Sequence, residues 1–272
     1  MDTPLYSVCN FVCEVVDSRL SSEDAVLSVV IPAYNEQFRL SETLARLSEL
    51  PDLDRVEVIV VCDGCTDQTE AIAMQWADRL RLRVISYPCN RGKGYAVRRG
   101  VLAASGNIIA YLDADGATRP AELLRLQMPI LEGDADIVIG SRRAYGAQVR
   151  RQPFLRHWFG KMLSVLTRVV LGLPYADTQC GCKLFRRDVA LELFEPLCCW
   201  GFAFDLEILS RAVACQAAVA EMGVVWNDQP GSKVHLFRDG LAMLKSLLLI
   251  RLVSVLRPQK AYLPARPVEA RG

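Results

Sequence analysis

The 272-residue sequence lacks the marks of several protein classes. Its net charge is only +1, so bulk charge gives no reason to expect a nucleic-acid partner. No apolar stretch reaches the ~20 residues that a membrane-spanning helix needs. No secretory signal peptide, internal repeat or low-complexity tract is present. The two histidines, His157 and His235, have no neighbours that would make them metal ligands.

Ten cysteines are present, but their arrangement does not indicate a disulfide framework or a zinc site. Several lie inside apolar runs, where free thiols are common. Cys62 and Cys65 have the spacing of one half of a zinc knuckle, but the sequence has no second such pair. We therefore expect reduced thiols in a cytosolic protein.

Short apolar runs alternate with amphipathic segments through the first half of the chain. The runs are almost continuously apolar, which is typical of parallel strands covered by helices on both faces. An α/β fold with a mostly parallel sheet is therefore predicted, and 51% hydrophobic content suffices for one substantial core. The expected strands are 26–31, 56–61, 83–86, 108–112 and 136–140, and the expected helices are 41–50, 66–82, 95–105 and 120–131.

The character of the sequence changes after residue 145. Residues 154–173 and 241–256 have helical apolar spacing with basic residues among them, and no acidic residue occurs between Arg142 and Arg168. Each helix could pack in the core or lie on a membrane surface. The organisation expected is a variable leader (1–24), a half in which strands and helices alternate (25–150), a second half (151–240), an amphipathic interfacial helix (241–257) and a flexible tail (258–272).

Two carboxylates, Asp113 and Asp115, directly follow the apolar run 108–112. Such a pair can hold a divalent cation that neutralises a diphosphate, although acidic pairs in turns are common. Polar residues also follow the other strands, and ligands of parallel sheets bind at the carboxyl ends of the strands. We therefore expect one rim to be formed by Tyr34, Asn35, Glu36, Asp63, residues 90–94, the Asp113/Asp115 pair, Ser141 and Arg142.

Several of these segments resemble the inverting family-2 glycosyltransferases, which have the GT-A fold. The segment 29–36 (VVIPAYNE) is similar to the opening of that family. Further segments resemble its dolichyl-phosphate β-glucosyltransferase branch, and the matches occur in family order over residues 26–257. They are Asn90–Gly94, Asp113–Thr118, Ile139–Arg142, Asp177–Gly181, Lys183–Phe185, Phe204–Glu207 and Gly231–Lys233.

The resemblance implies transfer of glucose from UDP-glucose to a polyprenyl phosphate, with inversion and with Mg²⁺ or Mn²⁺. It also implies a peripheral position on the cytosolic face of a membrane, with a membrane-protein partner or a homo-oligomer left open. Three alternatives remain. They are a polyprenyl-phosphate mannosyltransferase using GDP-mannose, a family-2 enzyme with a hydroxyl acceptor, and a non-enzymatic sugar-nucleotide-binding module.

The same resemblance implies that residues 25–150 form the nucleotide-sugar-binding half and residues 151–240 the acceptor-binding half, and it assigns site residues. The nucleotide sugar would contact Pro32, Tyr34, Asn35, Glu36, Asp63, Lys93, Asp113, Ala114 and Asp115, and the metal would be held by Asp113 and Asp115. The glycines beside Lys93 would let the diphosphate come close. Arg142, Ser232 and Lys233 would bind the acceptor phosphate. The catalytic set would be Asp113, Asp115, Arg142 and Asp205.

A phosphate acceptor is already an anion near neutral pH, because its second pKa is about 6. It therefore needs charge neutralisation more than a general base. Asp205 and Glu207 could bind sugar or act as a base, but Asp205 could equally cap a helix and Glu207 could lie on its surface.

The sequence also departs from the family pattern. Cys62 stands where family members commonly have the first of two aspartates. The N-terminal membrane anchor that is typical of the eukaryotic glucosyl branch is not evident, so attachment is expected to depend on the amphipathic helices or on a partner. Residues Trp226–Asp228 favour the glucosyl branch over the mannosyl branch.

Overall fold

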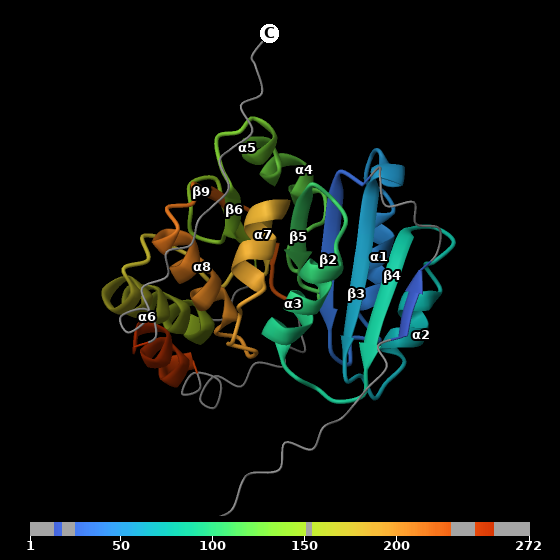
Figure 1. The fold of residues 1–272 in the computed structure, drawn as a ribbon, viewed down its shortest axis with the longest axis horizontal. Helices are drawn as coiled ribbons and strands as arrows, with labels where there is room; N and C mark the ends of the chain where they lie inside the picture. The colour runs from blue at the N-terminus through green and yellow to red at the C-terminus, as the bar shows by residue number, and fades with distance from the viewer. Residues whose placement is uncertain (1–13, 18–24, 151–153, 230–242, 253–272) are drawn as a thin grey trace, which may run out of the picture.

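The structure, a computed structural model, describes residues 14–17, 25–150, 154–229 and 243–252 (Figure 1). An eight-stranded sheet has the order β1-β4-β3-β2-β5-β8-β6-β9, and β7 and β10 form a separate parallel pair. The strands are β1 Glu14–Asp17, β2 Leu27–Ala33, β3 Val56–Asp63, β4 Arg81–Tyr87, β5 Ile108–Leu112, β6 Ile137–Ser141, β7 Gln148–Arg150, β8 Cys182–Arg186, β9 Val219–Gly223 and β10 Val225–Asn227.

The sheet is mostly parallel, as predicted. Strands β4, β3, β2 and β5 pair in parallel, and so do β6 and β9. The sequence did not indicate β8, which runs antiparallel between β5 and β6. Nor did it indicate β1, an antiparallel edge strand within the expected leader. Because β8 and β9 come from the second half of the chain, one sheet runs through both expected halves; the domain division itself stays a prediction.

Helices cover both faces of the sheet, and each face has its own apolar core. Side chains of α1, α2, α4 and α5 contribute to one core, and side chains of α3, α7, α8 and the helix at residues 243–252 contribute to the other. The helices are α1 Leu40–Leu47, α2 Thr69–Met74, α3 Lys93–Ala103, α4 Glu122–Leu126, α5 Met128–Leu131, α6 Phe154–Leu171, α7 Arg187–Phe194 and α8 Phe204–Ala214, with a short 3₁₀ helix, η1, at Leu53–Arg55.

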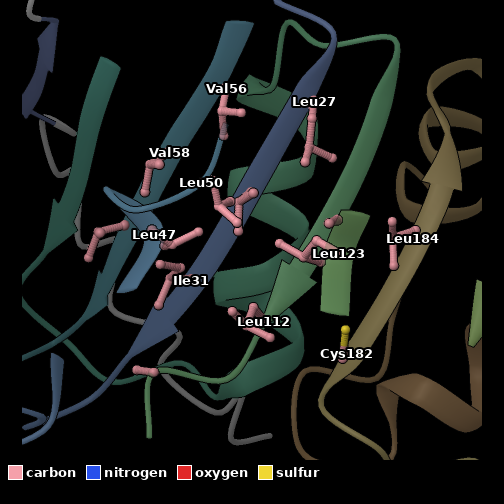
Figure 2. Close-up of a cluster of buried hydrophobic side chains, with 14 of the residues drawn as sticks. Leu27, Ile31, Leu47, Leu50, Val56, Val58, Leu112, Leu123, Cys182 and Leu184 are labelled. Atoms are coloured by element: carbon pink, nitrogen blue, oxygen red, sulfur yellow. The ribbon is translucent and has the colours of Figure 1, made fainter. Parts of the chain in front are cut away.

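Strand β3 shows why these sequences form central strands. All eight of its residues are buried, and successive side chains enter opposite cores. Val58 packs with α1 residues such as Leu47 (Figure 2), whereas Ile59 packs on the α3 side. A strand covered on both faces is therefore apolar at most positions, and the buried Glu57 of β3 is hydrogen-bonded by Ser28 and Ser105.

Two expected helices differ from the prediction. The helix predicted over 120–131 is divided into α4 and α5, with Pro129 in the first turn of α5. Proline has no backbone N–H to continue the preceding helix, which accounts for the break. The helix predicted over 66–82 is limited to the six residues of α2. Within the described part of the chain, none of the helices combines the length and the hydropathy that crossing a bilayer requires.

Candidate active site

The loops that follow β2 and β3 are joined at the rim of the sheet. Asn35 has a φ of 53°, and its side-chain oxygen accepts a hydrogen bond of 2.8 Å from the backbone N–H of Thr66. The backbone N–H of Glu36 donates to the Thr69 hydroxyl at 2.6 Å. The Glu36 carboxylate is paired with Arg39, with an Nη2–Oε2 distance of 2.5 Å. These contacts fix the shape of the loop that carries Tyr34, Asn35 and Glu36.

Asp63 ends β3 and organises the loop in front of α3. Its carboxylate is buried and accepts hydrogen bonds from the backbone N–H groups of Arg91 at 2.7 Å and Gly92 at 2.9 Å. The side chain of Asn90 donates to the Asp63 carbonyl. Asp63 therefore positions the loop that precedes Lys93, a role that the sequence did not indicate.

Lys93 and the Asp113/Asp115 pair form the charged centre of the rim. The Lys93 ammonium lies 2.6 Å from Oδ1 of Asp113. Burial alone would lower the pKa of Lys93, but the nearby carboxylates, Asp113 first, raise it above its usual value. Burial, followed by the charge of Asp113, raises the pKa of Asp115 to about 6. The centre is therefore crowded with negative charge that one ammonium only partly offsets.

The glycines beside Lys93 have a different role from the one expected. A Cβ on Gly92 would lie 2.4 Å from the Trp200 carbonyl oxygen, and a Cβ on Gly94 would lie 2.4 Å from that of Cys199. The space beside them is thus filled by the chain's own 198–201 loop. The Trp200 carbonyl accepts from the Gly94 N–H at 2.7 Å, which caps the start of α3.

Glu207 holds that loop in place. It is buried, and its carboxylate accepts from the backbone N–H groups of Cys198 and Cys199 while it pairs with Arg211 at 2.7 Å. Both oxygens are occupied by these donors. The arrangement identifies Glu207 as a residue that supports the loop, in place of the surface position or base considered from the sequence.

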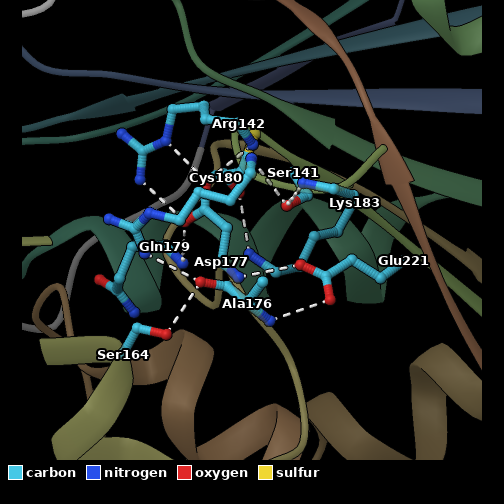
Figure 3. Close-up of polar contacts among 11 residues, drawn as sticks. Ser141, Arg142, Ser164, Ala176, Asp177, Gln179, Cys180, Lys183 and Glu221 are labelled. Carbon is cyan, nitrogen blue, oxygen red and sulfur yellow. Dashed lines mark hydrogen bonds and ion pairs between the residues drawn. The ribbon is translucent and has the colours of Figure 1, made fainter. Parts of the chain in front are cut away.

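Arg142 lies at the end of β6 and is paired with Asp177 (Figure 3). Its Nε and Nη2 donate to the two carboxylate oxygens at 2.7 and 2.8 Å, and its guanidinium lies over the Trp226 ring at 5.4 Å. The loop carrying Asp177 is held in turn by Glu221, which accepts from the N–H groups of Ala176 and Asp177. Arg142 is therefore fixed in direction, and much of its charge is neutralised.

Beneath the rim lies a fully buried polar cluster that the sequence analysis missed. The Lys183 ammonium contacts Oδ1 of Asp205 at 2.7 Å and the Tyr111 hydroxyl at 2.8 Å, and that hydroxyl donates a short hydrogen bond to the same Asp205 oxygen. A lysine inside the apolar stretch of β8 was the available signal, because lysine is rarely buried unless it is paired.

The remaining site predictions have mixed outcomes. Of the residues predicted to contact the nucleotide sugar, Pro32 lies within β2 and Tyr34 is 41% exposed at the rim. The backbone carbonyl of Ala114 accepts a hydrogen bond from the Thr43 hydroxyl. Ser232 and Lys233 lie outside the described residues. Hydrogen bonds and ion pairs connect the β2 and β3 loops, Asp63 with the 90–94 loop, and Lys93 with Asp113. The predicted convergence on one rim is confirmed, whereas the role of each residue stays a prediction.

Comparison with known proteins identifies the family. Residues 28–194 match the model of glycosyl transferase family 2. The dolichyl-phosphate beta-glucosyltransferase of Dictyostelium discoideum is 34% identical over 87% of this chain and 77% of that protein. The mouse protein of the same name is 36% identical over 88% of this chain and 79% of its own length.

Solved structures support the fold. Glucosyl-3-phosphoglycerate synthase from Mycobacterium tuberculosis, crystallised with Mn²⁺, UDP and glucosyl-3-phosphoglycerate, is similar with a TM-score of 0.63 and 23% identity, over 85% of this chain and 79% of that one. TarS of S. aureus with UDP-GlcNAc has a TM-score of 0.57 and 18% identity, over 84% of this chain and 66% of that one. The α/β fold is the GT-A fold expected from the sequence. The chain is thus a glycosyltransferase that belongs to glycosyl transferase family 2.

Proposed function

We propose that this glycosyltransferase transfers glucose from UDP-glucose to a polyprenyl phosphate of the dolichyl type, with inversion at the anomeric carbon. The observation that carries the proposal is the 34–36% identity to dolichyl-phosphate beta-glucosyltransferases over most of the chain. The geometry of the rim is compatible with each part of the reaction.

The donor would bind over the carboxyl ends of β2, β3 and β5. The loop of Tyr34, Asn35 and Glu36 and the end of β3 at Asp63 would form the uridine side, as in the sequence-based assignment. Lys93 would then face the diphosphate, since its ammonium already lies at the most acidic point of the rim. A diphosphate placed there would take over the ammonium from Asp113, because both compete for the same cation.

Asp113 and Asp115 fit a divalent cation. The donor set is two carboxylates, and the described residues include no group of three or more metal-ligating side chains. Mg²⁺ is usually bound by one or two carboxylates together with substrate phosphates. After burial, the charge of Asp113 is the next cause that raises the pKa of Asp115, and a cation would relieve this repulsion. Such a cation would neutralise charge on the departing UDP.

The acceptor phosphate would bind near Arg142. Asp177 occupies the Nε and Nη2 sides of the guanidinium, which leaves Nη1 to contact a phosphate oxygen. Because Asp177 offsets much of the charge, Arg142 would orient the phosphate more than attract it. The phosphate is itself the nucleophile and requires no base.

A membrane surface would present the acceptor. Among the described side chains of α6 and of the helix at residues 243–252, several apolar ones are exposed, and Arg168, Lys245 and Arg251 are exposed near them. Exposed apolar side chains flanked by basic residues are typical of helices at an anionic bilayer surface. The exposed apolar residues are Met162, Val165, Val169, Leu244, Leu248, Leu249 and Leu252.

Surface binding can be tested by flotation with vesicles that contain anionic lipid. We expect Val165→Glu combined with Leu248→Glu to reduce bound protein at least fivefold. Leu131→Glu is the matched control, because Leu131 is comparably exposed but lies on α5, away from α6 and from the helix at residues 243–252 (Figure 1). Equal binding of all three proteins would reject this surface.

The reaction itself is tested with purified protein, Mn²⁺ and paired substrates. UDP-glucose and GDP-mannose are compared as donors, and polyprenyl phosphate is compared with the corresponding polyprenol as acceptor. We expect an organic-extractable product from UDP-glucose and the phosphate only. Product from GDP-mannose would show that the protein is a mannosyltransferase, and product with the polyprenol would show that the acceptor is a hydroxyl group.

A further inference from the structure

Lys183 lies at the centre of the sheet and is completely shielded from solvent. It stands in β8 opposite Tyr111 of β5 and Ile139 of β6, and its relative exposure is 0%. A buried ammonium is costly unless it is paired and fully hydrogen-bonded. Its presence in a strand that otherwise needs only apolar residues therefore calls for a specific reason.

All three donors of the Lys183 ammonium are used within the protein. They are directed to Oδ1 of Asp205 at 2.7 Å, the Tyr111 hydroxyl at 2.8 Å and the Cys180 carbonyl at 2.8 Å. An ammonium group has three N–H bonds, so none is left for a substrate. Lys183 can therefore act on the reaction only through the groups that it holds.

Each of the three groups that Lys183 contacts is connected to the rim through the chain or through a neighbouring side chain. Tyr111 lies in β5, which ends one residue before Asp113. Cys180 precedes Gly181, whose carbonyl accepts from the Asp113 N–H at 3.0 Å. Gly181 also lies against the Asp113 side chain, because a Cβ there would be 1.8 Å from Oδ2.

The third partner, Asp205, begins α8 beside Phe204, whose ring lies 6.0 Å from the Lys93 ammonium. Oδ1 of Asp205 already accepts from two donors, the Lys183 ammonium and the Tyr111 hydroxyl. An oxygen occupied in this way is poorly placed to take a proton from a substrate hydroxyl.

We infer that Lys183 is a positioning residue of the active site. Its ammonium fixes β5 beneath Asp113, the Gly181 turn behind Asp113, and Asp205 at the start of α8. The carboxylate of Asp113, which would hold the metal beside the diphosphate, therefore stays in one orientation. Asp205 is then the anionic anchor of this arrangement. The inference rests on the proposed function in one respect, namely that the Asp113 carboxylate takes part in binding the sugar-nucleotide donor.

The test compares wild type with Lys183→Met, Asp205→Asn and the double variant. Arg186→Met is the matched control, because it removes an ion pair to Asp136 from the same strand away from the rim. Three quantities are measured, namely the melting temperature, kcat/KM for glucosyl transfer, and the Kd of UDP with and without Mn²⁺. The double variant carries no unpaired buried charge, so it keeps the test valid if a single variant does not fold.

We expect Lys183→Met to weaken UDP binding in Mn²⁺ about tenfold and to lower kcat/KM about 100-fold, as is typical when support of a metal ligand is lost. UDP binding without Mn²⁺ should be unchanged. The double variant should melt closer to wild type yet lose as much activity as either single variant, because the groups act as a unit. Arg186→Met should melt earlier with unchanged UDP affinity.

The inference is overturned if folded Lys183→Met, or the double variant in its place, binds UDP with Mn²⁺ as wild type does. It is equally overturned if the losses of the single variants multiply in the double variant, or if Arg186→Met loses the Mn²⁺-dependent affinity to the same degree. Failure of the proposed function is a separate result, because wild type would then bind UDP with Mn²⁺ but transfer no glucose to the lipid. The Kd comparison would still decide the role of Lys183.

Discussion

Replacing Asp177 with asparagine should remove a pH-dependent part of the stability. The Asp177 carboxylate is buried, and it accepts from Nε, Nη2 and the backbone N–H of Arg142 and from the N–H of Gln179. Burial alone would raise its pKa, but the hydrogen bonds and charge of Arg142 outweigh burial and lower the pKa to about 2. An unfolded chain has a carboxyl pKa of about 3.9 at this position.

The sign and size of the effect follow from this difference. Because the folded-state pKa is the lower one, the ionised carboxylate stabilises the fold above about pH 4, and this contribution is lost as the pH falls toward 2. This difference between the two pKa values corresponds to about 2–3 kcal/mol at pH 7, of which about half remains at pH 3. Asparagine has no such dependence, so the stability gap between the two proteins should narrow in acid.

The assay is urea unfolding at pH 7, 5, 4 and 3 for wild type, Asp177→Asn and Asp134→Asn. Asp134 is exposed, so its variant should stay close to wild type at every pH. The gap for Asp177→Asn should be largest at pH 7 and shrink by about 1 kcal/mol at pH 3. A gap that is constant over this range would refute the account of the Arg142–Asp177 pair.

Three further outcomes are expected. Gly94→Ala should destabilise the fold by about 1–3 kcal/mol in thermal unfolding, because the added Cβ would clash with the Cys199 carbonyl. Gly201→Ala is the control and should be neutral, because a Cβ at Gly201 would have no atom within 4 Å. Glu207→Ala should speed proteolysis of the 198–201 loop that its carboxylate holds, and loop cleavage at the wild-type rate would contradict that role. Asp113→Asn should abolish the Mn²⁺-dependent part of UDP affinity in a calorimetric titration. If the affinity of the variant still depends on Mn²⁺, residues other than Asp113 hold the metal.

The sequence did not indicate β9, which pairs in parallel with β6, but it was sufficient to predict strands β2 to β6, because a strand covered on both faces is apolar at most positions. Strand β8 was missed for the same reason. Its five residues include Lys183 and Arg186, which interrupt the apolar run, although Lys183 is buried and paired. Whether a charged residue belongs to a core depends on partners that are distant in sequence, here Asp205 and Tyr111.

The candidate site was predictable where a residue directly follows a strand. Asp63, Asp113 and Arg142 all lie at strand ends, and the parallel sheet brings such ends to one edge. The ion pair between Arg142 and Asp177 was not predictable, because the two residues are 35 positions apart in the sequence. The glycines beside Lys93 were assigned to ligand approach, since spacing alone does not reveal that the 198–201 loop fills that space.

The most direct test of the central claim is transfer of labelled glucose from UDP-glucose into a polyprenyl-phosphate product by the purified protein, with Asp113→Asn as the paired control. The account predicts label in the organic phase with wild type and only background with Asp113→Asn. Wild-type protein that binds UDP in the presence of Mn²⁺ but leaves the organic phase unlabelled would contradict it.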